Sequence, residues 1–294
     1  YLTEIRPLQE LGTNFANVLG AITKTKEILD VPVYEGGKDF PKNHEIELKN
    51  VRFSYDGKTD VLQGVNLTIK DGERMALVGQ SGAGKSTVVD ILLGLLEPST
   101  GHIYADSVDV KDAGNYRKWL KNIGYIPQMI FMLDDTIRKN VAFGVPEDTI
   151  DEDRLWEVLK EAQLDEFIKT LPEGLETGIG ERGIRLSGGQ RQALALLMAT
   201  MTPIDFLILD EHTAALDPKT AEIIMELTDQ VVKEKKVTTI MVTHNLRYAV
   251  EYGNRLIMMH EGKAILDKAG EEKKTINTEE IMAIFNRISV ECGN

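Results

Sequence analysis

A glycine-rich segment near residue 80 combines the residue types that bind phosphate groups. Residues 79–87 read GQSGAGKST and fit the pattern G-x-x-x-x-G-K-[ST], between an apolar run and an apolar stretch with helical spacing. Glycines let backbone N–H groups turn around an anion, and the start of a helix adds a favourable dipole. Lys85 can place a positive charge on the β- and γ-phosphates, and Ser86 can offer its hydroxyl to Mg²⁺. The residues expected at the nucleotide are Gly79, Gln80, Ser81, Gly82, Ala83, Gly84, Lys85, Ser86 and Thr87.

Two acidic residues follow a second apolar run, which spans residues 206–209. A buried parallel strand delivers such carboxylates at its C-terminal end, beside the phosphate-binding loop. There Asp210 can hold Mg²⁺, and Glu211 can polarise the water that attacks the γ-phosphorus. Each segment is ambiguous alone, because a solvated turn can end in acids and a glycine-rich turn can lack a ligand. Together they predict that the chain binds and hydrolyses a nucleoside triphosphate.

A third segment, residues 186–190, reads LSGGQ and lies upstream of the acidic pair. Ser187 can cap a helix here, so the first amides of that helix form a second anion site. In this position the segment resembles the signature of ATP-binding-cassette (ABC) ATPases, and the five-residue match favours this over the alternative of an ordinary Ser-Gly-Gly helix cap. The resemblance implies that the signature completes the site of a second subunit in trans, through Ser187, Gly188, Gly189 and Gln190.

Several single residues also resemble elements of this family. Tyr55 is similar to the aromatic residue that stacks on adenine, and Gln128 to the Q-loop glutamine, which contacts Mg²⁺ and couples the site to a helical insertion. Asp217 resembles the D-loop residue at the dimer interface, and His244 the switch histidine at the γ-phosphate. Residues 177–183 resemble the x-loop of exporters, which touches coupling helices. Read alone, the tyrosine could simply end a strand and the histidine could lie on the surface.

The resemblance covers residues 45 to about 267 and implies both a fold and a mechanism. The fold is α/β: a P-loop NTPase with a RecA-like parallel sheet core, an antiparallel β subdomain and an inserted α-helical subdomain. The implied activity is hydrolysis of MgATP in a head-to-tail dimer, with Glu211, His244 and Gln128 as catalytic residues and Ser86, Gln128 and Asp210 at the metal. The implied partners are a second nucleotide-binding domain and the transmembrane domains of a transporter, at the cytoplasmic face of the membrane.

The composition agrees with a folded, acidic protein. The 294 residues include 34 Lys and Arg against 47 Asp and Glu, a net charge of −13, and 42% are hydrophobic. The charge argues against sequence-independent binding of nucleic acid, which requires a basic surface. The single cysteine, Cys292, cannot form an internal disulfide, so a reducing compartment is expected. No stretch has the length and purity of a membrane span.

Hydrophobic periodicity predicts three regions. Residues 1–44 read as a helix and linker, like the tail of a membrane domain, and the start without Met suggests a fragment. Residues 45–270 form the ATPase domain, with a helical insertion at about 131–203, and residues 271–294 form a helical extension behind a cap at Asn277. Strands are expected at 46–53, 65–69, 74–78, 123–126, 206–209, 238–242 and 256–259, and helices at 85–96, 153–163, 188–201 and 218–232.

The two parts of the chain differ in subfamily character. Residues 135–141 and the x-loop are exporter-like, whereas Met198 replaces an arginine usual in exporters and residues 211–217 (EHTAALD) are similar to stand-alone importer ATPases. We therefore hypothesise a mosaic, exporter-like to about Gln190 and importer-like beyond it, by divergence or by recombination. Two alternatives to a transporter subunit stay open: a soluble ABC ATPase of translation or DNA repair, and a recombined module that binds nucleotide with little or no turnover.

Overall fold

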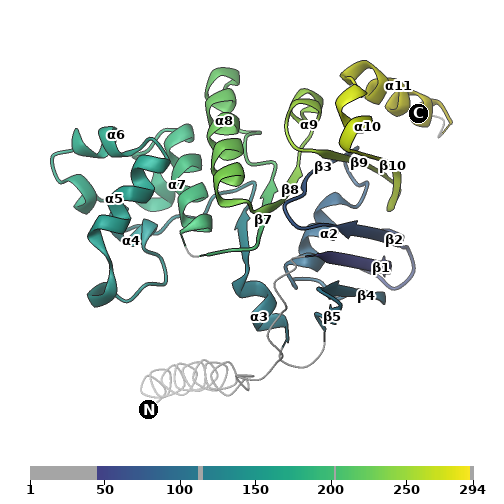
Figure 1. Cartoon of the computed structure of the whole chain (residues 1–294), viewed down its shortest axis with the longest axis horizontal. Coiled ribbons are helices and arrows are strands. Elements are labelled where there is room, and N and C mark those ends of the chain that lie inside the picture. Colours follow the sequence, from purple (N-terminus) through teal and green to yellow (C-terminus); the bar gives the residue numbers. More distant parts are fainter. Residues whose placement is uncertain (1–44, 112–114, 202, 292–294) are drawn as a thin grey trace, which may run out of the picture. The chain divides into compact units, whose positions relative to one another are not determined.

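The computed structural model describes residues 45–111, 115–201 and 203–291 (Figure 1). The expected N-terminal helix and linker, and Cys292, lie outside the described residues. Within the described part, no helix is both long enough and apolar enough to cross a membrane.

A six-stranded sheet, in the order β10-β9-β3-β8-β7-β6, forms the centre of the fold. Neighbouring strands from β9 to β6 run parallel, and β10 adds an antiparallel edge. Strands β3, β7 and β8 are buried along almost their whole length, as predicted from their apolar sequences. The strands are β3 (Arg74–Gly79), β6 (Ile123–Ile126), β7 (Phe206–Asp210), β8 (Thr238–Val242), β9 (Arg255–His260) and β10 (Lys263–Ala269).

A separate antiparallel sheet has the order β2-β1-β4-β5. Its strands alternate between buried and exposed residues, so that one face packs into the core. The sequence prediction missed two of its strands, because β4 buries only Ile103 and Ala105 and β5 has two residues. The strands are β1 (Ile46–Phe53), β2 (Leu62–Ile69), β4 (Thr100–Ala105) and β5 (Val108–Asp109).

In the described segment between β6 and β7 the regular elements are helices, besides one isolated β-bridge. These helices are α4 (Ile137–Val141), η1 (Glu147–Thr149), α5 (Glu152–Glu161), α6 (Asp165–Lys169), η2 (Gly174–Glu176), η3 (Glu181–Gly183) and α7 (Gly188–Thr200). The remaining helices are α2 (Lys85–Leu92), α3 (Asn115–Lys121), α8 (Pro218–Lys235), α9 (Leu246–Glu251), α10 (Gly270–Thr275) and α11 (Thr278–Glu291).

Two helix ends differ from the prediction. Helix α2 stops at Leu92 instead of continuing to residue 96, because Gly94 has a φ of 69° and the next two N–H groups both bond to the Asp90 carbonyl. Helix α8 continues past residue 232 and ends where Lys236 turns into the left-handed region. The predicted cap at Asn277 is present, since its side chain accepts the N–H of Glu280.

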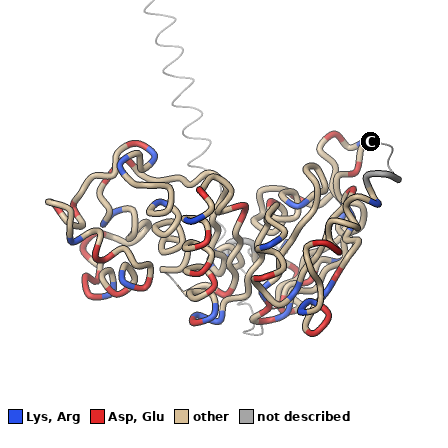
Figure 2. The backbone as a smooth tube through the Cα atoms, turned by 90° about the horizontal axis from the view of Figure 1, so that it is seen from above, with Lys and Arg blue, Asp and Glu red and all other residues tan. Residues whose placement is uncertain are grey.

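The central sheet separates two hydrophobic clusters. Alternate β3 residues enter opposite clusters: Ala76 and Val78 pack with residues of α7 and α8, whereas Met75 and Leu77 pack with α2 and the antiparallel sheet. Burial on both faces fixes the register of β3 and therefore the position of the loop that follows it. Along the described chain, basic and acidic residues are interspersed (Figure 2).

Candidate active site

The phosphate-binding loop joins β3 to α2, and two of its glycines lie where a side chain would be crowded. A Cβ on Gly79 would lie 2.5 Å from the carbonyl oxygen of Met259, and one on Gly84 would lie 2.6 Å from Leu62 Cδ2. Gly84 also caps α2 with a φ of 98°, in the region that favours glycine. The loop therefore turns directly into the start of α2, where the first helical amides lack intrahelical partners.

Lys85 lies inside this loop. Its side chain is 5% exposed, and Nζ donates hydrogen bonds to the carbonyls of Gly79 (2.8 Å) and Gln80 (3.0 Å). Burial lowers the pKa of the ammonium, while the nearby carboxylates of Glu211 and Asp210 oppose that shift. The loop thus holds a buried cation at the place where an anion would enter.

The acidic pair stands at the end of β7. Asp210 is the last residue of this strand, and Glu211 follows with a φ of 49° while its N–H bonds to the Val242 carbonyl (3.0 Å). Burial raises the pKa of Asp210, and repulsion from Glu211 adds to the shift, whereas Lys85 counteracts it. The two carboxylates therefore share a partly desolvated space with the ammonium of the loop.

Glu211 is contacted from both neighbouring strands. His244, after β8, places Nε2 at 2.5 Å from Glu211 Oε1, and Gln128, after β6, donates Nε2 to Glu211 Oε2 at 3.3 Å. The glutamate side chain is 13% exposed. The sheet order β8-β7-β6 brings these three side chains together from positions 128, 211 and 244.

The sequence analysis missed two residues of this region. Tyr125 on β6 hydrogen-bonds Asp210, and burial together with the charges of Asp210 and Asp90 raises its pKa to about 12. His212 is 2% exposed, its Nε2 lies 3.4 Å from Thr228 Oγ1, and burial lowers its pKa to about 4. Tyr125 carries no local pattern that indicates its contact with Asp210, and His212 stands directly after the predicted acidic pair.

The signature residues form a complete capping box at the start of α7. Ser187 Oγ accepts the N–H of Gln190 (3.2 Å), and Gln190 Oε1 accepts the N–H of Ser187 (2.8 Å). A Cβ on Gly188 would lie 2.9 Å from Leu216, and one on Gly189 would lie 2.7 Å from Thr220. The glycines thus allow α7 to approach the segment that leads into α8.

The structure does not gather all predicted site residues in one place. Gly188 lines a groove with Gln128, whereas Glu211 and His244 line a second groove with Asn245. Asp217 caps α8 by accepting the N–H of Thr220 (3.1 Å). Tyr55 is 66% exposed and packs edge-to-face on Phe53, with the ring centroids 4.8 Å apart.

Comparisons with known proteins identify the family. The sequence model of the family described as ABC transporter matches residues 62–214. The chain belongs to the ABC transporter family. The tyrosine transport ATP-binding protein of Clostridioides difficile (strain R20291) is 35% identical over 246 residues, which cover 82% of this chain and 98% of that protein.

Larger transporters are also similar to this ABC transporter domain. The ABC multidrug transporter MDR5 of Trichophyton rubrum is 35% identical over 302 residues, which cover 95% of this chain but 23% of that protein. ABC transporter B family member 29 of Arabidopsis thaliana is 40% identical over 220 residues, covering 74% of this chain and 34% of that protein. The chain thus spans about a quarter to a third of these two relatives.

A solved bacterial Atm1-family ABC exporter with ATP bound matches the structure with a TM-score of 0.75 and 27% identity, over 96% of this chain and 50% of that one. The chain is accordingly an ABC transporter nucleotide-binding domain with the P-loop NTPase fold, related to exporter ATPases, and it is an ATPase that uses ATP. These findings confirm the predicted fold and enzyme class. They favour a transporter subunit over a soluble ABC ATPase of another process.

Proposed function

We propose that the chain hydrolyses MgATP at a site built around Glu211, in a head-to-tail pair of nucleotide-binding domains that drives a transporter. The observation that carries the proposal is the position of Glu211, which lies between His244 and Gln128 at the strand edge that also presents Lys85. A carboxylate held in this way can accept a proton from a water next to a γ-phosphate.

Each side chain has a distinct task in this mechanism. Lys85 exchanges two carbonyl partners for phosphate oxygens, and the amides of the loop and of α2 surround the β-phosphate. Glu211 orients the attacking water and takes its proton. His244, whose Nε2 contacts Glu211 Oε1, is placed beside the glutamate to contact the γ-phosphate. Tyr55 offers an exposed ring to the adenine.

The donor atoms fit Mg²⁺, which prefers oxygen ligands. Ser86, Gln128 and Asp210 supply a hydroxyl, an amide oxygen and a carboxylate. Burial, and after it repulsion from Glu211, raises the pKa of Asp210. The described residues contain no group of three or more His, Cys, Asp or Glu that could hold a metal alone. We therefore expect the ion to bind together with the phosphates, where it neutralises charge on the β- and γ-oxygens.

The separation of the two anion sites supports a pair of domains. The signature helix α7 packs beside α8, whereas the phosphate-binding loop starts α2, so one chain presents the two sites on different elements. In a head-to-tail pair, Ser187, Gly188, Gly189 and Gln190 of one copy face the ATP on the other copy's phosphate-binding loop. Asp217 then lies at the interface.

The transmembrane partner is proposed to dock next to Gln128. The side chains of Met129, Phe131 and Ile184 are 79%, 72% and 77% exposed, although they are large and apolar. Exposed apolar groups that cluster beside a groove are typical of an interaction surface. This docking would place the domain at the cytoplasmic face of a membrane, with residues 1–44 as the tail of a membrane domain, 45–270 as the ATPase domain and 271–294 as an extension.

The mosaic hypothesis stays a prediction. A transport ATP-binding protein matched over almost its full length and larger multidrug transporters are both similar to this chain at 35% identity, so whole-chain identity does not separate its halves. Comparing residues 45–190 and 191–291 separately with both subfamilies tests the hypothesis. The same nearest subfamily for both halves would refute it.

Steady-state ATPase activity measured against protein concentration tests the proposed pair. Because each site needs residues from two copies, we expect the activity per molecule to rise with concentration before it reaches a plateau. A constant activity per molecule would contradict the shared site, and bound ATP without turnover would support the non-hydrolysing module.

A further inference from the structure

Lys273, on α10, is a buried cation far in sequence from the catalytic motifs. Lys273 is 4% exposed. Its Nζ donates hydrogen bonds to the backbone carbonyls of Val250 and Tyr252, the latter at 3.2 Å. Burial lowers the pKa of this ammonium, and repulsion from Arg74 adds to the shift. Burying a charge costs free energy unless it is paired or hydrogen-bonded, so the two carbonyl acceptors are what hold this ammonium in place.

The acceptors lie at the carboxyl end of α9. This helix has six residues, and an isolated helix of that length is not stable in water. Its last carbonyls lack intrahelical partners. A positive charge at this end both satisfies the carbonyls and complements the helix dipole. Lys273 therefore fixes one end of α9.

The other end of α9 carries the switch histidine. His244 directly precedes the N-cap Asn245, whose side chain accepts the N–H of Tyr248 (3.3 Å). Tyr248 and Ala249 are buried in the core cluster that also contains Ile276 and Ile281, after α10 and in α11. A displacement of α9 would thus move the residue that contacts Glu211.

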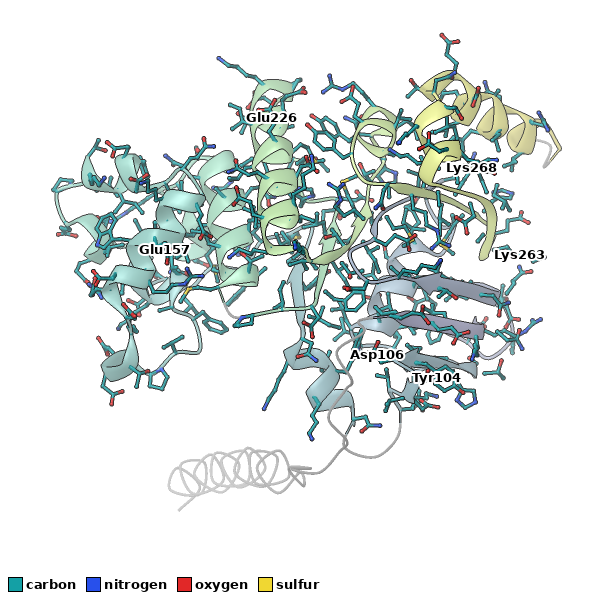
Figure 3. All side chains as sticks on the ribbon, in the orientation of Figure 1. Tyr104, Asp106, Glu157, Glu226, Lys263 and Lys268 are labelled. Carbon is teal, nitrogen blue, oxygen red and sulfur yellow. The ribbon has the colours of Figure 1, made fainter. Side chains whose placement is uncertain are left out.

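The remaining contacts of α10 tie it to the central sheet. The N–H of Gly270 bonds to the Asn254 carbonyl (3.1 Å), and Lys268 at the end of β10 pairs with Glu272 at 2.7 Å (Figure 3). Helices α9, α10 and α11 follow one another along the same end of the sheet (Figure 1). Helix α10 is therefore a fixed support from which Lys273 can hold α9.

We propose that Lys273 is a positioning residue for ATP hydrolysis, which holds α9 so that His244 remains at Glu211 and can reach the γ-phosphate. The inference rests on the proposed role of His244 and extends the catalytic machinery into the C-terminal extension. It predicts an effect on the chemical step, because the residue just before the N-cap of α9 is His244, which contacts Glu211.

The test compares Lys273→Met with Lys274→Met in the full 294-residue chain. Lys274 is the next residue of the same helix, and its side chain is 71% exposed and pairs with Glu271. We expect Lys273→Met to lower kcat roughly tenfold with KM for ATP unchanged, because a small misplacement of a catalytic group slows the chemistry. Lys274→Met should match the wild type. An unchanged kcat, or an equal loss in both variants, would overturn the proposal.

Repeating the comparison in a His244→Ala variant distinguishes a positioning role of Lys273 from a general loss of stability. In single-turnover measurements, His244→Ala should remove the effect, so that Lys273→Met causes no further loss when the histidine is absent. The same fold loss in both backgrounds would show that Lys273 does not act through His244. Wild-type turnover in His244→Ala alone would instead refute the proposed role of the histidine, which is a failure of the proposed function.

Hydrogen exchange gives a readout that does not depend on activity. We expect Lys273→Met to accelerate exchange of the amides of α9, while those of α7 keep the wild-type rate. If the methionine variant does not fold, Lys273→Gln retains an N–H donor for one carbonyl, and the same kinetic and exchange comparisons apply to it. Wild-type exchange in α9 together with wild-type kcat would overturn the proposal.

Discussion

At the residue scale, the site depends on where each charge is buried. The ammonium of Lys85 is buried and donates hydrogen bonds to two backbone carbonyls, so its positive charge lies within the loop that we propose binds phosphate. Glu211 is surrounded by donors on both sides. Asp210 receives the hydroxyl of Tyr125 in addition to the opposing charge of the lysine. The same edge of the sheet therefore holds a positive charge, which we propose binds the nucleotide, and negative charge, which we propose serves the metal and the water.

Replacing Lys85 tests the first of these roles. We expect Lys85→Ala to weaken ATP binding roughly 10- to 100-fold, because a charge-assisted hydrogen bond contributes about 1.5–3 kcal/mol. Titration with ATP by isothermal calorimetry measures the change, with Lys263→Ala on the exposed strand β10 (Figure 3) as the control. Unchanged affinity in Lys85→Ala would mean that the loop amides bind the phosphates without the lysine.

His212 predicts a pH dependence of stability. Its pKa is about 4 in the folded chain against 6.5 in its unperturbed state, because burial disfavours the charged form. Above the unfolded value the imidazole is neutral in both states. As the pH falls from 6.5 to about 4, the unfolded chain gains a proton that the folded chain does not bind, so the free energy of unfolding decreases by about 3 kcal/mol.

Urea unfolding of the wild type and His212→Ala between these pH values measures the effect. Carboxylates also titrate at the acidic end, so the difference between the two pH profiles isolates the histidine. We expect the alanine variant to lose less stability across the window, although the cavity lowers its stability at every pH. Parallel profiles would show that His212 does not titrate differently in the folded chain.

Sequence reasoning located the site residues with local signals and missed those without one. The composition of the glycine-rich loop predicts a phosphate-binding turn. The apolar run that ends in two acidic residues predicts a buried strand whose carboxyl end lies at the edge of the sheet. Tyr125 and Lys273 carry no such pattern, because their partners are brought to them by the neighbouring strand β7 and by the end of α9. Contacts of this kind depend on tertiary packing.

At the scale of elements, the central parallel strands were predictable and the sheet edges were not. Strands β7 and β8 are apolar runs that are buried along almost their whole length, whereas β10 is largely exposed. Strand β4 was missed because only two of its residues, Ile103 and Ala105, are buried. The family resemblance supplied the antiparallel subdomain that periodicity alone did not delimit.

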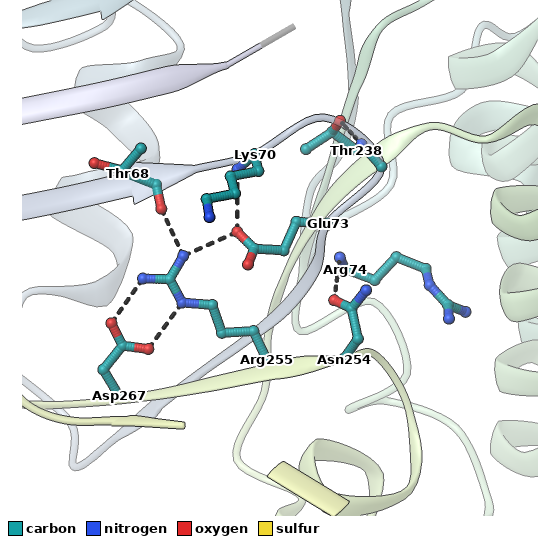
Figure 4. A network of polar contacts seen from close by, with 9 residues as sticks. Thr68, Lys70, Glu73, Arg74, Thr238, Asn254, Arg255 and Asp267 are labelled. Atoms are coloured by element: carbon teal, nitrogen blue, oxygen red, sulfur yellow. Dashed lines mark hydrogen bonds and ion pairs between the residues drawn. The ribbon is translucent and has the colours of Figure 1, made fainter. Parts of the chain in front are cut away.

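One arginine connects the elements at this edge (Figure 4). Arg255 on β9 donates to Asp267 on β10 through two nitrogens (2.6 and 2.8 Å), to the Thr68 carbonyl on β2 (2.5 Å) and to Glu73 before β3 (2.9 Å). Its side chain is 11% exposed and that of Glu73 is 14% exposed. The network joins the antiparallel sheet to the central one.

Removing this arginine should destabilise the fold. We expect Arg255→Met to lower the free energy of unfolding by about 2 kcal/mol or more, because Glu73 keeps a partly buried charge without its partner. Arg154→Met is the matched control, since Arg154 forms an exposed pair with Glu157 and should contribute about 0.5 kcal/mol or less. Urea unfolding measures both, and equal effects would contradict the structural role of the network.

At the scale of the whole molecule, the ABC transporter domain holds the two halves of a site on separate elements. The phosphate-binding loop and Glu211 lie at one edge of the central sheet, and the signature caps α7 of the helical region. A single chain presents both halves, and in the proposed head-to-tail pair each signature would face the other copy's loop. In this proposal ATP joins the two copies, and hydrolysis separates them.

Trapping this pair tests the central claim most directly. Glu211→Gln keeps the shape of the side chain and removes the base, so hydrolysis should stop while ATP still binds. Analytical ultracentrifugation of this variant should show a monomer without nucleotide and a dimer with MgATP, whereas Glu211→Gln combined with Ser187→Arg should remain monomeric with ATP bound. Steady-state hydrolysis at the wild-type rate in Glu211→Gln, or a variant that binds MgATP and stays monomeric, would contradict the account.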